Sequence, residues 1–536
     1  MNNQFEVESY SFRESGFFSN LMCDYLEQKE SLKHLVDGFP SFDSILSKAA
    51  SRQTLPLERE VLVASIQKQY ETQGLLNDRV AQQLSLLSKN NSFTVTTGHQ
   101  LNIFGGPLYV IYKIIDVLKL AQELTSQSKG KHFIPVFWMA SEDHDFDEIA
   151  NCKVNGEEIL WETHQSGAVG RMHLQEFSSV LEQYKNLLGL GVDTAELQQL
   201  FQKAYSKKHT LAQATRYWVA TLFKDSNLLI IDGDDVSLKA LFTPVIKKEL
   251  EESLVEKSIS PTNTFLKDNY HVQVNPRAIN LFYLDDSIRD RIERTETGFA
   301  LVGKVKAWTK DELLEELQNH PERFSPNALM RPMYQECILP NISYTGGGGE
   351  LAYWLQLKAS FNAFNISFPI LLMRNSWQFT DQKVFDRLSK TGVSGINFFQ
   401  DRTEWEQEFI SKIHGEQLQL DQEKVSYQDL ITSMKSIASG WDAGMENALD
   451  AEQARIQGSF KRLEKKLKAA AKRKSKEEIE YYHRWMDRLF DPSGLQERNE
   501  SLASMYGIHG ANWLKYLLDN THPVQTKFHL VKVKSN

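Results

Sequence analysis

The chain has 536 residues, of which 41% are hydrophobic and 24% are charged, and its formal net charge at pH 7 is −9. This length is sufficient for several domains with large buried cores. The negative charge argues against a dedicated nucleic-acid-binding protein, because contacts to phosphates require a basic surface.

The sequence does not indicate a membrane or secreted protein. No apolar run reaches the roughly 18–20 residues that span a bilayer, and the first residues lack the charged-then-apolar order of a signal peptide. Cys23, Cys152 and Cys337 stand singly, which favours a reducing compartment and argues against a zinc ribbon. We therefore expect a cytoplasmic protein with no membrane or nucleic-acid partner and no bound zinc.

The first ninety residues are predicted to be helical, because apolar residues recur at helical spacing over 57–70 and 80–87. A β-rich run at 93–95 then leads through a glycine-rich loop into an apolar-periodic helix over 108–124. Pro107 suits the first turn of that helix. This strand–loop–helix order is typical of an anion site in a Rossmann-like fold, because N–H groups at a helix start are unpaired and attract phosphate or carboxylate.

The loop itself carries candidate catalytic residues. Thr96-x-Gly98-His99 fits the T/H-x-G-H signature of nucleotidylyl-transfer enzymes, in which the histidine stabilises charge on a transferring phosphate. We expect Thr96 and His99 to be catalytic; a histidine satisfied inside a turn is the alternative. Lys113, well inside the helix, is expected to occupy a solvated or dipole-neutral position rather than to be a ligand. The anion-binding residues expected in this loop are Gly98, Gln100, Asn102, Gly105 and Gly106.

Three further buried strands are predicted, at 133–140, 228–231 and 368–373. The first of them completes a βαβ unit, which implies a parallel sheet. Ligands gather beyond the carboxyl ends of such strands, and a polar cluster follows each one, so we expect one shared site. The clusters are residues 96–100, 141–148, 232–235 and 374–376.

The acidic cluster has three interpretations. Residues Glu142–Glu148, which include Asp143, His144 and Asp145, have carboxylates and a histidine at the spacing of metal ligands, but they would also suit a cationic amine or cap a helix. A catalytic zinc needs three protein ligands, and no second histidine or cysteine partner is evident. We therefore expect no metal, a catalytic Asp143, and substrate contacts from Glu142, His144 and Asp145.

Four glycines at 346–349 precede Glu350 and a helical segment. Glycines let the backbone approach a ligand closely and form an anion-binding nest, whereas the alternative is a flexible hinge. The Lys-Ser/Thr of a Walker motif is missing. Arginine suits bidentate carboxylate pairing, with a structural ion pair as the alternative. The binding residues expected here are Gly347, Gly348, Glu350, Arg331, Arg374 and Asn375.

Residues 390–490 are predicted to form two heptad-like helices joined near Ala451, because residues such as Ile431 and Trp441 repeat with gaps of three and four. They would form a coiled-coil arm, as a hairpin or a dimer contact. The basic run at 461–476 is expected to be its solvated face. Its Lys-Arg-Lys-Ser-Lys stretch only superficially resembles the KMSKS signature of class I synthetases.

The motifs at residues 97–108, 138–145 and 346–350 together resemble the cysteine-adding enzyme family of bacillithiol biosynthesis, and the resemblance extends over essentially the whole chain. It implies an α/β fold: a Rossmann-like parallel sheet core with two connecting-peptide insertions, plus an α-helical coiled-coil domain that forms a homodimer. The expected boundaries are 1–90 for the helical N-terminal part of the core, 91–388 for the core with insertions at about 151–220 and 255–330, 389–500 for the coiled coil, and 501–536 for a segment that returns to the core.

The resemblance implies a ligase that adds cysteine to the amino group of glucosaminyl-malate, the final step of bacillithiol biosynthesis. The carboxylate of cysteine must be activated, and because no convincing KMSKS loop is present, ATP or another nucleotide stays open as the energy source. His99 and the glycine amides would stabilise developing charge. An acid of the 142–145 cluster would orient the amine or accept its proton, and Arg331 or Arg374 would hold the malyl carboxylates.

Two other classes of function stay open at this point. One is a non-catalytic nucleotide- or RNA-binding scaffold that works through its coiled-coil arm. The other is a metal-dependent hydrolase that uses Glu142, Asp143 and His144.

Overall fold

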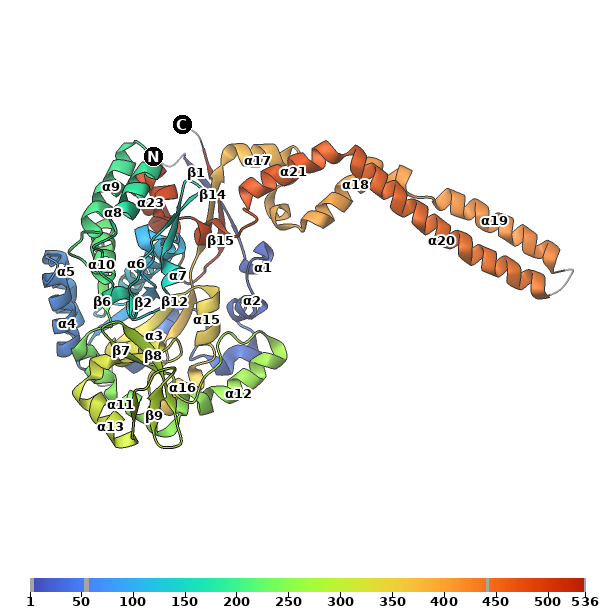
Figure 1. The fold of residues 1–536 in the computed structure, drawn as a ribbon. Helices are drawn as coiled ribbons and strands as arrows, with labels where there is room; N and C mark the ends of the chain where they lie inside the picture. Colours follow the sequence, from blue (N-terminus) through green and yellow to red (C-terminus); the bar gives the residue numbers. More distant parts are fainter. Residues whose placement is uncertain (1–3, 53–56, 440–442, 535–536) are drawn as a thin grey trace. The chain divides into compact units, whose positions relative to one another are not determined.

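A computed structural model describes residues 4–52, 57–439 and 443–534, which divide into two compact units (Figure 1). One unit holds Ser9–Gln378 and Ser493–Leu530; the other holds Met1–Glu8, Phe379–Pro492 and Val531–Asn536. None of the described helices has the length and apolar character needed to cross a membrane.

A five-stranded, fully parallel sheet is the centre of the first unit, with the order β13–β12–β2–β3–β6. Numbered along the chain, this order is 5-4-1-2-3, the Rossmann arrangement read from its other edge, with the reversal between β2 and β12. The strands are β2 (Ser92–His99), β3 (His132–Met139), β6 (Leu229–Asp232), β12 (Asn341–Gly346) and β13 (Ile370–Met373).

The predicted α/β class and its four predicted strands are confirmed, and their carboxyl ends are aligned. In the register, His99 lies beside Met139 and Met139 beside Asp232, so the polar clusters that follow these strands start at one edge of the sheet. The sequence missed β12, the strand next to the reversal. Its side chains alternate polar and apolar, yet all of its residues are buried in the middle of the sheet, where Thr96 donates to Asn341 and Thr97 to the carbonyl of Thr345.

Helix α6 (Tyr109–Gln127) connects β2 to β3 and packs on both strands. Its apolar periodicity predicted it correctly, but it begins at Tyr109 and not at Pro107. The amides at its start are already satisfied: the N–H of Leu108 donates to the carbonyl of Glu500 at 2.8 Å, and that of Val110 to Pro107 at 3.0 Å. The start of this helix therefore offers fewer free N–H groups than its sequence suggests.

Short helices precede the sheet, as expected, although β1 (Phe5–Tyr10) opens the described chain as a strand. The helices are α1 (Phe12–Ser15), α2 (Asn20–Leu26), α3 (Phe42–Arg52), α4 (Arg59–Glu71) and α5 (Asp78–Leu87). After the glycine run come α15 (Gly348–Trp354) and α16 (Lys358–Phe364), and near the end of the chain α22 (Gln496–Asn499) and α23 (Leu502–Asn520).

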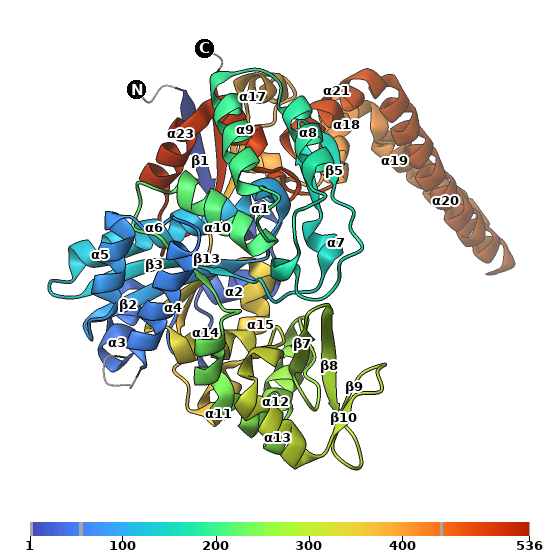
Figure 2. The same cartoon turned by 60° about the vertical axis from the view of Figure 1, so that its left-hand side comes forward.

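Two long excursions leave the sheet between its strands (Figure 2). The one after β3 contains α7 (Phe146–Ile149), β4 (Asn151–Val154), β5 (Glu157–Leu160), α8 (Ser178–Leu188), α9 (Val192–Ala204) and α10 (Leu211–Leu222). The one after β6 contains α11 (Val236–Glu252), α12 (Leu254–Asn269), β7 (Leu281–Asp285), β8 (Ile288–Arg294), β9 (Phe299–Leu301), β10 (Ala307–Trp308), α13 (Lys310–Asn319), β11 (Phe324–Pro326) and α14 (Arg331–Ile338). Strands β7 to β11 form an antiparallel sheet of order β10–β9–β8–β7–β11.

The second unit is mainly helical, and α19 and α20 lie side by side in it (Figure 1). Its helices are α17 (Gln382–Ser389), α18 (Arg402–Leu418), α19 (Asp421–Ala438), α20 (Ala443–Lys474) and α21 (Lys476–Leu489). The predicted joint near Ala451 is wrong, because α20 runs through that residue without a break. Trp441 lies outside the described residues.

A three-stranded sheet of order β1–β15–β14 includes β15 (Phe528–Val533), near the end of the chain. Its third strand is β14 (Ser376–Asp381). The chain passes from one unit to the other within each of these strands.

A buried polar network lies beside the central strands. Asn341 accepts hydrogen bonds from Thr94 (3.1 Å) and Thr96 (2.7 Å), and its amide donates to Glu336 at 2.7 Å. Burial raises the pKa of Glu336 to about 7, although the charge of Arg52 and the hydrogen bonds from Asn341 and Gln335 lower it. Ionised Glu336 is therefore unfavourable in the folded chain.

We expect Glu336→Gln to flatten the pH dependence of stability of this unit. Glu336 ionises near 4.5 when unfolded and near 7 when folded. The folded state therefore binds more protons in this range, and the free energy of unfolding falls as the pH rises, by at most about 1.4 kcal/mol per pH unit. Glutamine does not titrate, so this contribution vanishes.

Urea denaturation followed by tryptophan fluorescence, at several pH values from about 5 to 8, measures this slope. Glu315→Gln, at an exposed position of α13, is the matched control and should keep the wild-type slope. A wild-type slope in the Glu336→Gln variant would contradict the role assigned to burial.

Candidate functional site

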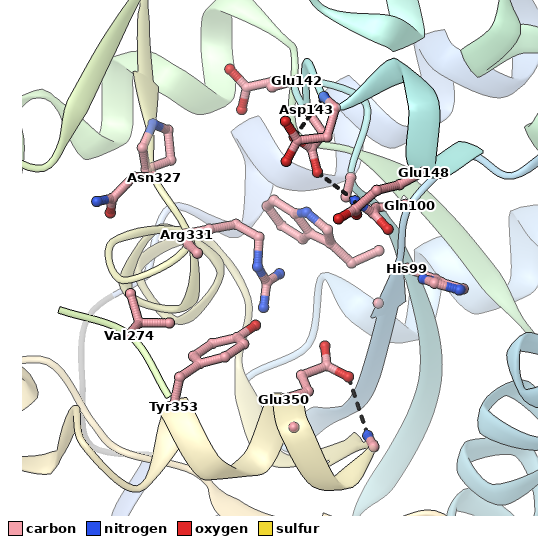
Figure 3. A pocket seen from close by; sticks show the side chains of 18 of the residues that line it. His99, Gln100, Glu142, Asp143, Glu148, Val274, Asn327, Arg331, Glu350 and Tyr353 are labelled. Carbon is pink, nitrogen blue, oxygen red and sulfur yellow. Dashed lines mark hydrogen bonds between the residues drawn. The ribbon is translucent and has the colours of Figure 1, made fainter. Parts of the chain in front are cut away.

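A cavity of about 760 Å³ opens at the carboxyl ends of β2, β3 and β12, where the strand order reverses (Figure 3). Ligands of open α/β sheets bind at such reversal points. The residues expected from the sequence that line it are Gly98, His99, Gln100, Glu142, Asp143, His144, Asp145, Arg331, Gly347, Gly348, Glu350 and Arg374.

Gly105 and Gly106, expected to bind an anion, do not line this cavity. A Cβ on Gly105 would lie 3.2 Å from Leu502, and one on Gly106 would lie 3.3 Å from Ser501. Gly105 also has a φ of +67°, which favours glycine. These two glycines are therefore required for close packing of the C-terminal segment against the loop.

Thr96, Asn102 and Asn375 also lie outside the lining. The Thr96 hydroxyl points into the sheet and donates to Asn341, which does not fit the catalytic role expected for it. Asn102 donates to the carbonyl of Glu148 at 2.9 Å. Asn375 is fully buried, and its backbone and side-chain N–H groups donate to Asp116 at 2.7 and 2.9 Å. The hydrogen bonds of Thr96, Asn102 and Asn375 therefore stabilise the fold and do not face the cavity.

His99 ends β2 and occupies one corner of the cavity, on the ring of Tyr109 with 5.0 Å between centroids. Its Nε2 is buried and has no hydrogen-bond partner among the described residues. Burial, together with the charges of Lys113 and Arg374, holds the pKa of His99 well below its ordinary value. The imidazole is therefore neutral at neutral pH.

Asp143 and Glu148 form an acidic wall of the cavity, and Gln100 bridges them. The Gln100 amide donates to Asp143 at 2.8 Å and to Glu148 at 2.7 Å. Burial raises the pKa of Asp143, but hydrogen bonds from His144 and Gln100 and the charge of Arg289 outweigh it and hold the pKa well below its usual range. Asp143 is thus a fixed anion and a weak base.

Arg289, from β8, shapes this wall and was not predicted. It donates to Nδ1 of His144 at 2.6 Å and lies 3.9 Å from Asp143. Oxygen and nitrogen atoms of Asp143, His144 and Asp145 lie within 4.8 Å of one another, as metal ligands would. Arg289 occupies one of the two histidine nitrogens and adds a positive charge beside the cluster, which opposes a cation there. The geometry favours a hydrogen-bonded acidic wall over a metal centre.

Glu142 turns toward a second group of charges. Its carboxylate pairs with Lys239 at 2.6 Å, and Lys239 also pairs with Asp234 at 3.1 Å. Asp234 in turn receives both guanidinium donors of Arg171 at 2.6 and 2.7 Å. The cluster at 232–235 does not line the main cavity, so the expectation of one site shared by all four clusters is wrong for this one.

Lys113 is buried, so the solvated position, one of the two expected for it, is wrong. Its ammonium donates to the carbonyl of Gly98 at 2.9 Å and pairs with Glu350 at 2.5 Å. Glu350 also accepts hydrogen bonds from Tyr344 and from the N–H of Gly347. Burial raises the pKa of Glu350, but Lys113 and Tyr344 hold it below its ordinary value. Glu350 therefore has its protein partners already and fixes the glycine-rich turn.

The two candidate arginines differ in their partners. Arg374 donates to both oxygens of Glu497 at 2.7 and 2.6 Å, and both side chains are almost fully buried. Arg331 lies 5.6–6.0 Å from the rings of Trp138, Tyr344 and Trp354. Its Nη2 is buried with no hydrogen-bond partner among the described residues. Arg374 is thus neutralised, whereas Arg331, which faces the cavity (Figure 3), donates to Gln335 but pairs with no carboxylate of the described residues.

We expect Lys113→Met to destabilise the first unit by about 3–5 kcal/mol, because it leaves Glu350 as a buried charge without its cation. The double variant Lys113→Met with Glu350→Gln should recover part of this loss. Lys119→Met is the matched control: Lys119 lies on the same helix, is partly exposed and pairs with Glu123 only at 3.9 Å. It should change stability by less than about 1 kcal/mol.

Urea denaturation of the full chain measures these differences. Equal effects of the Lys113 and Lys119 substitutions would contradict the structural role of the buried pair.

Comparison with known proteins agrees with this architecture. The model "Bacillithiol biosynthesis BshC, N-terminal Rossmann-like domain" matches residues 5–375, and "Bacillithiol biosynthesis BshC, C-terminal coiled-coil domain" matches residues 377–533. A protein of Flavobacterium johnsoniae is 37% identical over 98% of this chain and 100% of its own length. One of Cytophaga hutchinsonii is 35% identical over 97% of each chain.

Both relatives carry the name "Putative cysteine ligase BshC". A further relative with this name, from Flavobacterium psychrophilum, is 34% identical over 98% of this chain and 99% of its own length. The matches cover the sheet, the cavity and the long helices alike. The chain belongs to the BshC family of bacillithiol biosynthesis.

Proposed function

We propose that this chain is the ligase that joins cysteine to the amino group of glucosaminyl-malate in the final step of bacillithiol biosynthesis. The names of its relatives support a cysteine ligase. The cavity supports the acceptor substrate, because it offers an unpaired cation for carboxylates and, separately, an acidic wall for an amine.

The observation that carries the proposal is the state of Arg331. A buried guanidinium without a carboxylate is unfavourable unless a ligand supplies the missing charge. Among the described residues no carboxylate pairs with it; its Nη1 donates to the neutral side chain of Gln335 at 3.1 Å. The three aromatic rings around it restrict its orientation. We assign Arg331 to the malyl carboxylates.

The acidic wall suits the amino group of the acceptor. Asp143 and Glu148 both accept from Gln100, and the lowered pKa of Asp143 keeps its carboxylate ionised. An anion of this kind attracts and orients an amine but is a weak proton acceptor. We therefore revise the role of Asp143 from acid–base catalysis to orientation of the amine.

Amide formation also needs an activated carboxyl group on cysteine. Neutral His99, at the edge of the same cavity, has a free buried nitrogen that suits the charge developing on that group. ATP or another nucleotide as the source of activation is part of the proposal and is tested separately from the acceptor.

The test is a reaction of purified protein with cysteine, glucosaminyl-malate and ATP or another phosphoryl donor, with the thiol product followed by mass spectrometry. We expect Arg331→Gln to raise the KM for glucosaminyl-malate by about 10- to 100-fold, the loss expected for one charge-assisted contact. Arg331→Lys keeps the charge but not the planar fork, so its KM for glucosaminyl-malate should lie between those of the wild type and Arg331→Gln.

Glucosamine, which lacks the malyl carboxylates, is the substrate control. The wild type should use it less efficiently, and Arg331→Gln should have no further effect on it. No thiol product with any donor would overturn the ligase proposal. An equal effect of Arg331→Gln on both acceptors would overturn the assignment of Arg331 alone.

We also propose that the long helices form a homodimer. In the single chain Ile431 and Ala438 are buried, but Met434, Ile437 and Leu463 of the same helices are exposed by 44%, 68% and 49%. Exposed apolar residues at heptad spacing are typical of a helix that packs on another chain.

Light scattering coupled to size-exclusion chromatography should give a dimer mass for the wild type. Replacing Met434, Ile437 and Leu463 together by glutamine should shift it toward the monomer. Replacing exposed polar residues of the same helices, Gln422 and Lys465, by alanine is the control. A monomeric wild type would contradict the dimer.

A further inference from the structure

A short segment after the long helices contributes directly to the cavity wall. Glu497, on α22, is almost fully buried and accepts hydrogen bonds from both terminal nitrogens of Arg374 and from Ser376 at 2.6 Å. The carbonyl of Glu500 accepts from the N–H of Leu108. These bonds fix the segment against α6 and the end of β13, and they bring the next residue, Arg498, to the cavity lining.

Arg498 and His99 both line the cavity, as does Tyr109. The ring of Tyr109 contacts the His99 ring, and the Arg374 guanidinium lies 4.9 Å above it. Burial raises the pKa of Tyr109, and the charges of Arg374 and Arg498 oppose this rise, so both cations act at the same hydroxyl. In Figure 3 His99 is turned away from Arg331, which makes its corner a place distinct from the Arg331 end.

The charges of this corner do not cancel. Lys113 is neutralised by Glu350, and Arg374 by Glu497. Arg498 is exposed, and no carboxylate of the described residues pairs with it. Among Lys113, Arg374 and Arg498, only Arg498 lacks a carboxylate partner among the described residues, and the buried Nε2 of His99, in the same cavity, has no hydrogen-bond partner there.

We propose that Arg498 and His99 bind an oxyanion of the cysteine-donating half-reaction: the carboxylate of cysteine or the phosphoryl group of its activated form. The inference rests on the proposed ligase function and adds to it a binding residue from the C-terminal segment. A guanidinium presents a fork of N–H donors that matches either anion. The malyl carboxylates, held by Arg331, occupy the other end of the cavity.

The test measures binding to the full chain by calorimetry, so it does not require turnover. The probes are inorganic phosphate, cysteine, cysteamine (which lacks the carboxylate) and malate. We expect Arg498→Gln to weaken the binding of phosphate or cysteine at least ten-fold and to keep the affinity for malate within two-fold of the wild type. Arg498→Lys should restore part of the lost affinity. Loss of phosphate alone assigns a phosphoryl group. Loss of cysteine, with cysteamine unaffected, assigns the carboxylate.

Arg277→Gln is the matched control, because Arg277 also lines the cavity, is exposed and has no carboxylate partner among the described residues. Phosphate and cysteine binding should stay within two-fold in that variant. His99→Ala should weaken the same probe as Arg498→Gln.

Binding of both probes within two-fold of wild type in Arg498→Gln, or no measurable binding of either probe to wild type, would overturn the inference. So would an equal loss in Arg277→Gln. If malate binding depends on Arg331 but the binding of phosphate and cysteine does not depend on Arg498, this inference is overturned, whereas the assignment of Arg331 to the acceptor is retained. Circular dichroism of each variant shows whether the fold is retained.

Discussion

A buried ion pair between Lys113 and Glu350 joins the two sides of the sheet where its strand order reverses. Lys113 belongs to the helix that follows β2, and Glu350 to the helix that follows β12. Each partner makes a further bond, Lys113 to Gly98 and Glu350 to Tyr344, so both loops that border the cavity are tied to one pair. Separating two charges in a low-dielectric interior is costly, which keeps the loops at a fixed distance.

The remaining charges of the cavity follow from this arrangement. Pairs such as Arg374 with Glu497 and Glu142 with Lys239 cancel and hold the walls. Arg331 and Arg498, which like Arg277 have no carboxylate partner among the described residues, are left to attract anions, while Asp143 and Glu148 form a separate acidic wall. A cavity in which structural charges cancel and few remain free selects a ligand by the position of its charges.

Local sequence patterns predicted most of the sheet and much of the cavity. The apolar runs of β3, β6 and β13 are local signals, and the rule that ligands bind at strand ends brought His99, Asp143 and Arg374 together. The strand β12 has no such signal, because the polar residues Asn341, Ser343 and Thr345 alternate with apolar ones and are nevertheless buried between β2 and β13. Gly105 and Gly106 look like anion-binding glycines but serve packing against residues about four hundred positions later. Glu497 and Arg498 carry no motif at all.

The ion pair between Arg374 and Glu497 also connects two segments that are far apart in the sequence. The helical unit Phe379–Pro492 is an insertion in the chain of the α/β unit, which resumes at Ser493. Arg374 stands just before the insertion and Glu497 just after it, so their ion pair closes a very long loop at its root. Closing such a loop is entropically unfavourable, and a strong buried contact at the root offsets that penalty. Arg374 and Arg498, the residue after Glu497, both line the cavity, so the contact that closes this loop also brings two residues distant in the sequence to one binding site.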